Sequence, residues 1–251
     1  MKQKSLILCS CLFMLLTSLV NSSDKILTPI YAYHLKPPYI ISLEQETGLY
    51  FDFSRYLNTK AGPYQFHTSF IPRKRVEAYL DRNILDGALI GVNPVWFKDK
   101  KKTKYLWTSP IMQDTDDIIS AANSKFEYTG PRSLYGKTLG GVLGFYYFGI
   151  DDEIKAGNIL REDTTNEAAV LNMILRQHVD VGIVSRSTYN YLIKQNNWQG
   201  RFYIAKRPHD KFTRHILVPT RYADLFSYLE QIVKKMHTDP AWQAILRNYE
   251  E

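Results

Sequence analysis

The sequence predicts an α/β protein built on mostly parallel sheets, and three observations lead to that class. Strand-like and helix-like segments alternate along the chain from residue 25 onward. Two of the expected strands, 85–92 and 179–185, are almost wholly apolar, as in parallel strands that are covered on both faces. No low-complexity linker divides the chain. A compact fold with helices on both sides of its sheets is therefore expected.

The first half of the chain contains three expected strands and two expected helices. Residues 25–33 are rich in β-forming side chains and predict a strand. Residues 49–62 place apolar side chains at helical spacing and end in a glycine. Residues 64–71 form the next expected strand. The short helix 72–83 begins with a proline and leads into the apolar strand 85–92.

The second half repeats this alternation without repeating the sequence. Residues 137–144 predict a strand that enters a glycine turn, and 166–177 predict a helix. The apolar strand 179–185 follows. Two amphipathic helices, 225–236 and 242–249, end the chain. Ligands of such sheets bind beyond the carboxyl ends of the strands, so the turns after these strands are the places to look for a site.

The first residues predict export. A short basic start is followed by the apolar run 6–20 and a polar stretch, which is the layout of a signal peptide (1–22) cleaved after Ser22. An uncleaved membrane anchor is the alternative. Both cysteines, Cys9 and Cys11, lie within this segment, so the remaining chain can form neither a disulfide nor a Cys-ligated metal site. Its length suits one large domain or two small lobes.

The charge of the chain indicates little about partners. The net charge of +7 loses Lys2 and Lys4 on cleavage, which leaves a mild bias toward anionic partners. We expect no nucleic-acid partner. The lysines between residues 98 and 104 are interrupted by Asp99 and predict a solvated loop.

Catalytic and cofactor motifs are not supported. A phosphate-binding loop requires four residues between its glycine and Gly-Lys-Thr, whereas five separate Gly130 from Gly136. The six histidines show no metal-ligand spacing, and no G-x-S-x-G turn occurs. The sequence therefore predicts no metal, no cofactor and no enzyme activity.

Six segments in order resemble one family, the bacterial extracellular solute-binding proteins of family 3, which serve polar amino acid ABC transporters. The matching segments are "KPPYIISLEQETGLYFDF" (36–53), "LDGALIGV" (85–92), "YLWTSPI" (105–111), "SLYGKTLGGVLG" (133–144), "LRQHVDVGIVS" (175–185) and "DPAWQAILRNY" (239–249). Each segment is weakly specific alone, and the ordered set spans nearly all of the chain that follows the signal peptide.

The resemblance implies two α/β lobes joined by two hinge strands, with a solute trapped between them. We expect residues 23–114 and 208–251 to form the first lobe and 115–207 the second, because the polar stretches 112–117 and 205–211 resemble crossings. The family also implies a periplasmic monomer that delivers a small-molecule solute to an inner-membrane ABC permease. A membrane sensor as the partner, or a cyclohexadienyl-dehydratase-like enzyme on the same scaffold, are the alternatives.

The chain departs from the family where members bind the α-amino acid group. Lys98 stands where members carry an arginine that grips the ligand carboxylate, and Ser185, followed by Arg186, stands where an acid meets the ammonium. The resemblance therefore implies a solute other than a standard α-amino acid. The residues expected to line the cleft are Tyr33, Tyr39, Arg75, Asn93, Trp96, Lys98, Phe145, Tyr146, Ser185 and Arg186.

Overall fold

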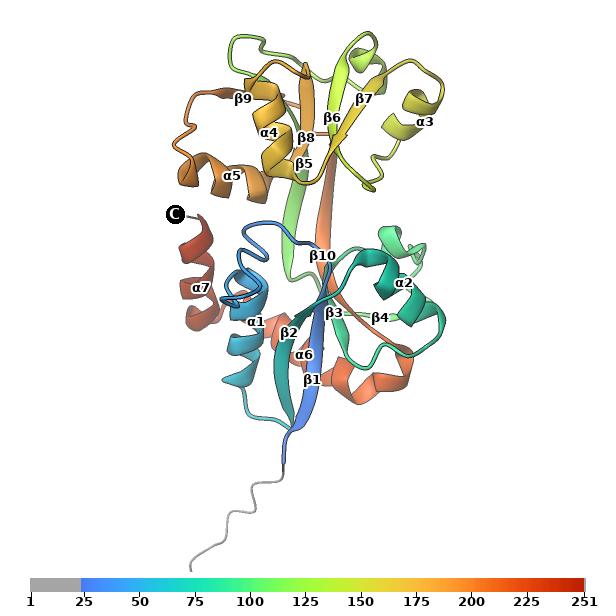
Figure 1. Ribbon diagram of the computed structural model, residues 1–251. Helices are drawn as coiled ribbons and strands as arrows, with labels where there is room; N and C mark the ends of the chain where they lie inside the picture. Colours follow the sequence, from blue (N-terminus) through green and yellow to red (C-terminus); the bar gives the residue numbers. More distant parts are fainter. Residues whose placement is uncertain (1–23, 251) are drawn as a thin grey trace, which may run out of the picture.

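The computed structural model describes residues 24–250 and shows two lobes, one above the other in Figure 1. Two long strands, β5 (Met112–Ala121) and β10 (Asp210–Val218), run from one lobe into the other. The predicted signal peptide, 1–22, lies outside the described residues. Within 24–250, no helix has the length and apolar character needed to cross a membrane.

The first lobe holds a mixed sheet in the order β2-β1-β3-β10, with β4 paired to β10. Strand β1 is parallel to both of its neighbours, and β10 runs antiparallel to β3. The strands of this lobe, apart from β10, are β1 (Ile26–Ala32), β2 (Tyr64–Phe70), β3 (Ala88–Val92) and β4 (Leu106–Trp107).

Helices cover the faces of this sheet. Amphipathic α1 packs on one face together with α6 and Trp242, which is fully buried, and α2 packs with Leu89 and Trp107 on the other. The helices are α1 (Leu49–Asn58), α2 (Arg73–Asp81), α6 (Ala223–Met236), α7 (Pro240–Glu250) and the short η1 (Pro94–Phe97) and η3 (Thr220–Tyr222). Helix α1 ends before Gly62, which instead lies so close to the Tyr228 ring that a Cβ there would be 2.3 Å from it.

The second lobe continues from β5 in the order β5-β8-β6-β7, with β9 on the other side of β5. Strands β6, β7 and β8 are parallel, and β5 is antiparallel to β8. Its elements are η2 (Pro131–Leu134), β6 (Thr138–Val142), α3 (Ile150–Lys155), β7 (Leu160–Thr164), α4 (Glu167–Leu175), β8 (Val181–Ser185), α5 (Arg186–Gln195) and β9 (Phe202–Ile204).

Close packing fixes the start of α4 over this sheet. A Cβ at Gly182 would lie 2.4 Å from the Val170 side chain, so the glycine lets the helix approach the strand. The apolar side chains of α4 and α5 pack against β5 and β8. The N-terminal ends of α4 and α5 are thereby held at the side of the lobe that faces the first lobe (Figure 1).

The two crossing strands change partners where they pass between the lobes. Residues 210–214 of β10 pair with 112–116 of β5, and the next residues of β10 pair with β3 and β4 after an irregularity at His215. From Asp116 onward, β5 pairs with β8. The boundaries predicted at 114/115 and 207/208 fall within β5 and just before β10, and they stay predictions. Asp114 and Asp116 thus lie at the junction of the lobes.

Candidate binding site between the lobes

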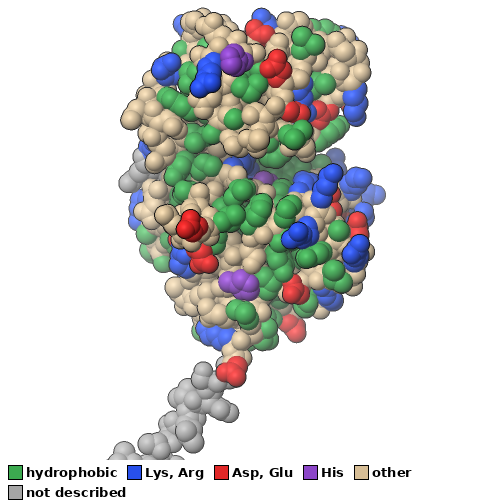
Figure 2. Space-filling model, viewed as in Figure 1, with side chains coloured by type: hydrophobic (Ala, Val, Ile, Leu, Met, Phe, Trp, Pro, Cys, Tyr) green, Lys and Arg blue, Asp and Glu red, His purple; other side chains and the backbone are tan. Residues whose placement is uncertain are grey.

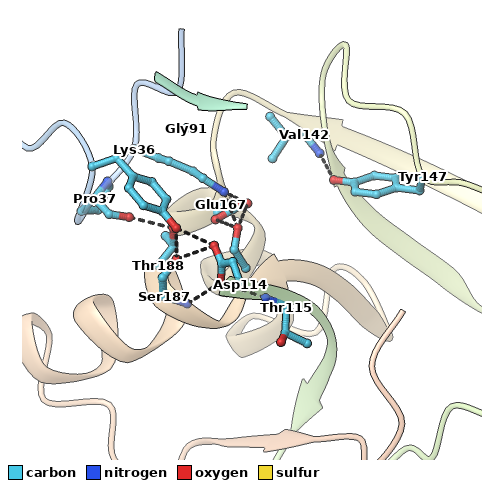
Figure 3. Close-up of polar contacts among 12 residues, drawn as sticks. Lys36, Pro37, Gly91, Asp114, Thr115, Val142, Tyr147, Glu167, Ser187 and Thr188 are labelled. Atoms are coloured by element: carbon cyan, nitrogen blue, oxygen red, sulfur yellow. Dashed lines mark hydrogen bonds and ion pairs between the residues drawn. The ribbon is translucent and has the colours of Figure 1, made fainter. Parts of the chain in front are cut away.

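The segment that follows β1, residues 33–41, reaches from the first lobe to the second (Figure 3). The Thr188 hydroxyl in α5 donates to the carbonyl oxygen of Pro37 over 2.7 Å. A pocket of about 200 Å³ lies between this segment and the start of α4. Figure 2 shows the molecule hollowed between the two lobes, with Lys and Arg side chains gathered on the first lobe beside the hollow.

A buried ion pair joins the two lobes at this point. Lys36 Nζ lies 2.7 Å from Glu167 Oε1, and the two side chains are only 8% and 5% exposed. The Lys36 ammonium also donates to Ser185 Oγ, which in turn donates to Glu167 Oε1 over 2.9 Å. Glu167 is the first residue of α4, where the helix dipole favours a carboxylate. The second lobe therefore offers an anionic position that the first lobe fills.

A second buried cluster surrounds Asp114 on β5. Arg214 on β10 is 1% exposed; its Nη2 lies 2.9 Å from Asp114 Oδ2, and its Nη1 donates to the Gly91 carbonyl over 3.0 Å. Tyr39 and Ser187 donate to the same carboxylate over 2.5 and 2.9 Å. Burial raises the pKa of Asp114, but the charges of Arg214 and Lys36 outweigh that effect and lower the pKa to about 2. Asp114 is therefore ionised at neutral pH.

Asp116 lies on the same face of β5 and differs from Asp114 in having no partner. Its carboxyl makes no hydrogen bond to any residue between 24 and 250 and is partly exposed. Burial raises its pKa to about 7; the Lys36 charge opposes this shift, and the Glu167 charge adds to it. A carboxyl that is half protonated at neutral pH and has no partner is available to a ligand.

Aromatic side chains of the first lobe form a wall around two guanidinium groups. The Arg73 guanidinium lies 5.2 Å from the Tyr33 ring centre, donates to the Tyr33 hydroxyl and donates to the Trp96 carbonyl over 2.7 Å. The Arg214 guanidinium lies 5.5 Å from the Trp96 ring centre and 5.0 Å from that of Phe212. Such contacts hold each cation in place while leaving ring surface for a guest.

His34 lies within this wall. Its ring centre is 4.0 Å from that of Tyr33 and 5.8 Å from that of Trp96. The residue is 7% exposed, and its Nδ1 is buried without a hydrogen-bond partner among the described residues. Burial, together with the charges of Arg214 and Lys36, holds the pKa of His34 well below its usual range. The imidazole is therefore neutral, with a ring nitrogen left unsatisfied.

The loop after β6, residues 143–148, contributes the second lobe's aromatic side chains. Tyr147 is buried, and its hydroxyl accepts from the Val142 amide over 3.1 Å, which pins the loop (Figure 3). Phe145, Tyr146 and Phe148 stay 38%, 61% and 78% exposed. The Phe145 ring centre lies 6.0 Å from Lys36 Nζ. The loop thus leaves apolar surface uncovered beside the ion pair.

The structure brings together five of the residues expected from the sequence. Tyr33, Tyr39 and Trp96 surround the buried guanidinium groups of the first lobe. Ser185 and Phe145 lie on the other side of the cleft, against Lys36.

The other five expected residues lie apart from this group or use their polar groups elsewhere. The Asn93 amide caps η1 and donates to the Thr213 carbonyl over 2.9 Å, and Arg186 pairs with Asp117. Arg75, Lys98 and Tyr146 are exposed and, among the described residues, make no hydrogen bond or ion pair with the cluster. On α2 it is Arg73, two residues before Arg75, that faces the site.

Seven residues of the site were not expected from the sequence, namely His34, Lys36, Arg73, Asp114, Asp116, Glu167 and Arg214. Two signals could have found some of them. The first signal is that Asp114 and Asp116 are two positions apart, so on a strand both carboxylates face the same side. The second is that Lys36 directly precedes the proline turn. The ion pairs Lys36–Glu167 and Asp114–Arg214 join residues that are 131 and 100 positions apart, so they leave no local pattern.

Comparison with solved structures shows which fold this is. The arginine-binding protein of T. maritima, as a mutant, superimposes with a TM-score of 0.68 at 12% identity over 89% of this chain and 94% of that one. An ancestral arginine-binding protein bound to arginine gives 0.67 at 14% identity over 90% and 98%. The glutamate-bound ligand-binding core of GluR0 from Nostoc punctiforme gives 0.68 at 12% identity over 89% and 100%.

These likenesses confirm the predicted fold class, an α/β fold of two lobes like that of periplasmic binding proteins. No family model matches the chain, and no curated protein matches it. The likeness at this level of identity concerns the fold alone. What the site binds must be argued from its own residues.

Proposed function

We propose that this chain is a periplasmic solute-binding protein that closes its two lobes on a small solute and performs no chemistry on it. One observation carries this proposal: among the described residues, the partly exposed Asp116 carboxyl at the junction of the lobes and the buried His34 Nδ1 in the aromatic wall have no hydrogen-bond partner. Polar groups without hydrogen bonds destabilise the empty protein, so a ligand that forms hydrogen bonds with them binds more favourably. Asp116 lies on β5 where that strand passes from one lobe to the other, which supports a ligand held by hinge closure.

The solute's surroundings are partly apolar and partly charged. Tyr33, Trp96 and Phe145 offer ring surface, while Lys36 and Arg73 offer cations. A small organic molecule with a flat or apolar body and polar ends fits that lining. The proteins named above bind arginine or glutamate, which supports a small polar solute as the guest.

We further propose that the loaded protein acts as a monomer and hands its solute to an inner-membrane ABC permease. A solved neighbour that is the substrate-binding protein of an amino acid ABC transporter supports this partner; it matches with a TM-score of 0.66 at 12% identity. A membrane sensor would read the same closed state. Pull-down from membranes with and without solute, followed by identification of the captured protein, separates the two partners.

The test is to find the solute and show that it occupies this cleft. Native mass spectrometry of freshly isolated protein, followed by a thermal-shift screen of metabolites, should give a bound mass and a raised melting temperature. His34→Ala should weaken binding of the hit at least about tenfold. The matched control His178→Ala removes an exposed histidine and should leave binding unchanged. Absence of any bound mass or shift, or equal loss in both variants, contradicts the proposal.

A further inference from the structure

We propose that Lys36 determines specificity by acting as a tethered ammonium: it fills the anionic position at Glu167 and Ser185, so that the cleft selects organic acids that carry no ammonium of their own. This inference rests on the proposed function and names the solute class for the same cleft. It assigns Lys36 a role in selection in addition to the stability that its ion pair with Glu167 provides.

The anionic position is already satisfied from within the chain. Glu167 accepts from Lys36 and from the Ser185 hydroxyl, and these three polar groups lie 4% to 7% exposed or fully buried. A guest ammonium that took this place would have to expel Lys36 and leave its charge unpaired in the cleft. Breaking a buried ion pair in this way costs several kcal/mol, so an ammonium-bearing guest is disfavoured.

The same lysine leaves one donor for a guest. An ammonium carries three N–H donors, and the structure accounts for two of them, at Glu167 and Ser185. The Arg73 guanidinium, which is paired with Glu77 over 2.9 Å and is 37% exposed, adds N–H groups at the aromatic wall. These groups favour a carboxylate or another hydrogen-bond acceptor on the guest.

The charges around Asp116 mean that an acidic guest fits the protonated form of this residue. Lys36 and Arg214 are balanced by Glu167 and Asp114, so an ionised Asp116 adds one uncompensated negative charge to the cleft. A protonated Asp116 instead supplies an O–H donor. Binding of an organic anion should therefore take up a proton at Asp116 and weaken as the pH rises above 7.

The first experiment tests whether the position accepts an ammonium when Lys36 is removed. Lys36→Ala should lose stability and regain it when propylammonium chloride is added, compared with sodium chloride at equal ionic strength. The control Lys36→Ala/Glu167→Gln has no anionic position and should show no such rescue. If Lys36→Ala does not accumulate folded, its refolding yield in the two salts gives the same readout. Absence of rescue, or equal rescue in the control, overturns the inference.

The second experiment tests selection with matched pairs of compounds that differ only at the ammonium. Thermal shifts are measured with phenylpyruvate against phenylalanine and with 2-oxoglutarate against glutamate. The wild type should prefer an oxo acid by at least about tenfold, and Lys36→Ala should lose or reverse that preference. A wild type that binds the amino acids as tightly overturns the inference while upholding a solute-binding protein. If neither set binds and native mass spectrometry finds no solute, the proposed function fails and this inference with it.

Discussion

Replacing Asp116 with asparagine should make the protein more stable at pH 8 and should stabilise it much less at pH 5. The Asp116 pKa is raised from 3.8 to about 7, mainly by burial. Between these two pH values the unfolded chain has released the proton while the folded chain keeps it. The free energy of unfolding of the wild type therefore falls as the pH rises from about 4 to about 7.

The size of the effect follows from the shift in pKa. Each unit corresponds to about 1.4 kcal/mol, so three units set an upper bound of about 4 kcal/mol. Asp116 is partly exposed in the cleft, and solvent screening should reduce the gain to about 2 kcal/mol. Asparagine has a similar shape and does not titrate, so the variant should escape this loss.

The assay is urea unfolding of both proteins at pH 5, 6, 7 and 8. The difference in unfolding free energy between Asp116→Asn and wild type should already be about a third of its full size at pH 5, grow to about pH 7 and level off by pH 8. Asp114, whose pKa is about 2, contributes stability that is lost only in stronger acid, outside this window. The control Asp24→Asn removes an exposed aspartate and should give a difference that does not change with pH. A constant or shrinking difference for Asp116→Asn refutes the reasoning.

Three further changes test other parts of the account. Asp114→Ala should lower the free energy of unfolding by about 3–5 kcal/mol in urea titrations, because Arg214 is left buried without its partner; a loss below about 1 kcal/mol would contradict this pairing. Gly91→Ala should cost more than Gly200→Ala in thermal melts, although both glycines have positive φ: a Cβ at Gly91 would lie 1.7 Å from a tyrosine hydroxyl, whereas none of the described atoms lies within 4 Å at Gly200. Equal losses of stability in the two variants would contradict the close approach of Tyr50 to Gly91. Trp96→Ala should weaken solute binding in calorimetry by at least about tenfold while shifting the melting temperature little; a stability loss without a binding loss would make Trp96 a packing residue.

Local sequence patterns predicted most of the larger helices and strands, because these elements bury one face with a regular period. The apolar runs that became β3 and β8 and the spacing in α1 and α6 were all readable from the sequence. The short elements β4, β7, β9 and α3 were missed, and so was the ten-residue helix α5. The short elements have only two to six residues, which are too few to show a helical or strand period, so their secondary structure is decided by tertiary pairing.

The site was harder to predict because its charges are paired over long distances. Lys36 and Glu167 are 131 residues apart, and Asp114 and Arg214 are 100 apart, so no local motif announces either pair. The acids of β5 have the composition of an exposed linker, yet pairing with β8 and β10 buries Asp114 and Asp117. Buried charges of this kind are explained only when their partners are known.

The choice between Arg73 and Arg75 shows a second limit of sequence reasoning. Side chains two positions apart on an α-helix point about 200° away from each other. If the buried face of α2 is assigned wrongly, an exposed residue is therefore predicted in place of the one that faces the cleft. The resemblance to a family placed the loop after β3 near the cleft, and Trp96 lies there. Lys98, two positions after Trp96, has a left-handed backbone conformation (φ 53°) at the end of η1 and is exposed. The sequence did not predict this turn.

The central claim, that two lobes close on a solute, is tested most directly by a distance measured across the cleft. The only cysteines of the chain, Cys9 and Cys11, lie in the predicted signal peptide, so spin labels can be placed at Lys100→Cys in the first lobe and Glu162→Cys in the second, both at exposed positions. Double electron–electron resonance should give a shorter and narrower distribution of distances between the two spin labels when the best-binding organic acid of the screen is present at saturation. An unchanged distribution with the acid bound would contradict closure of the lobes around a guest.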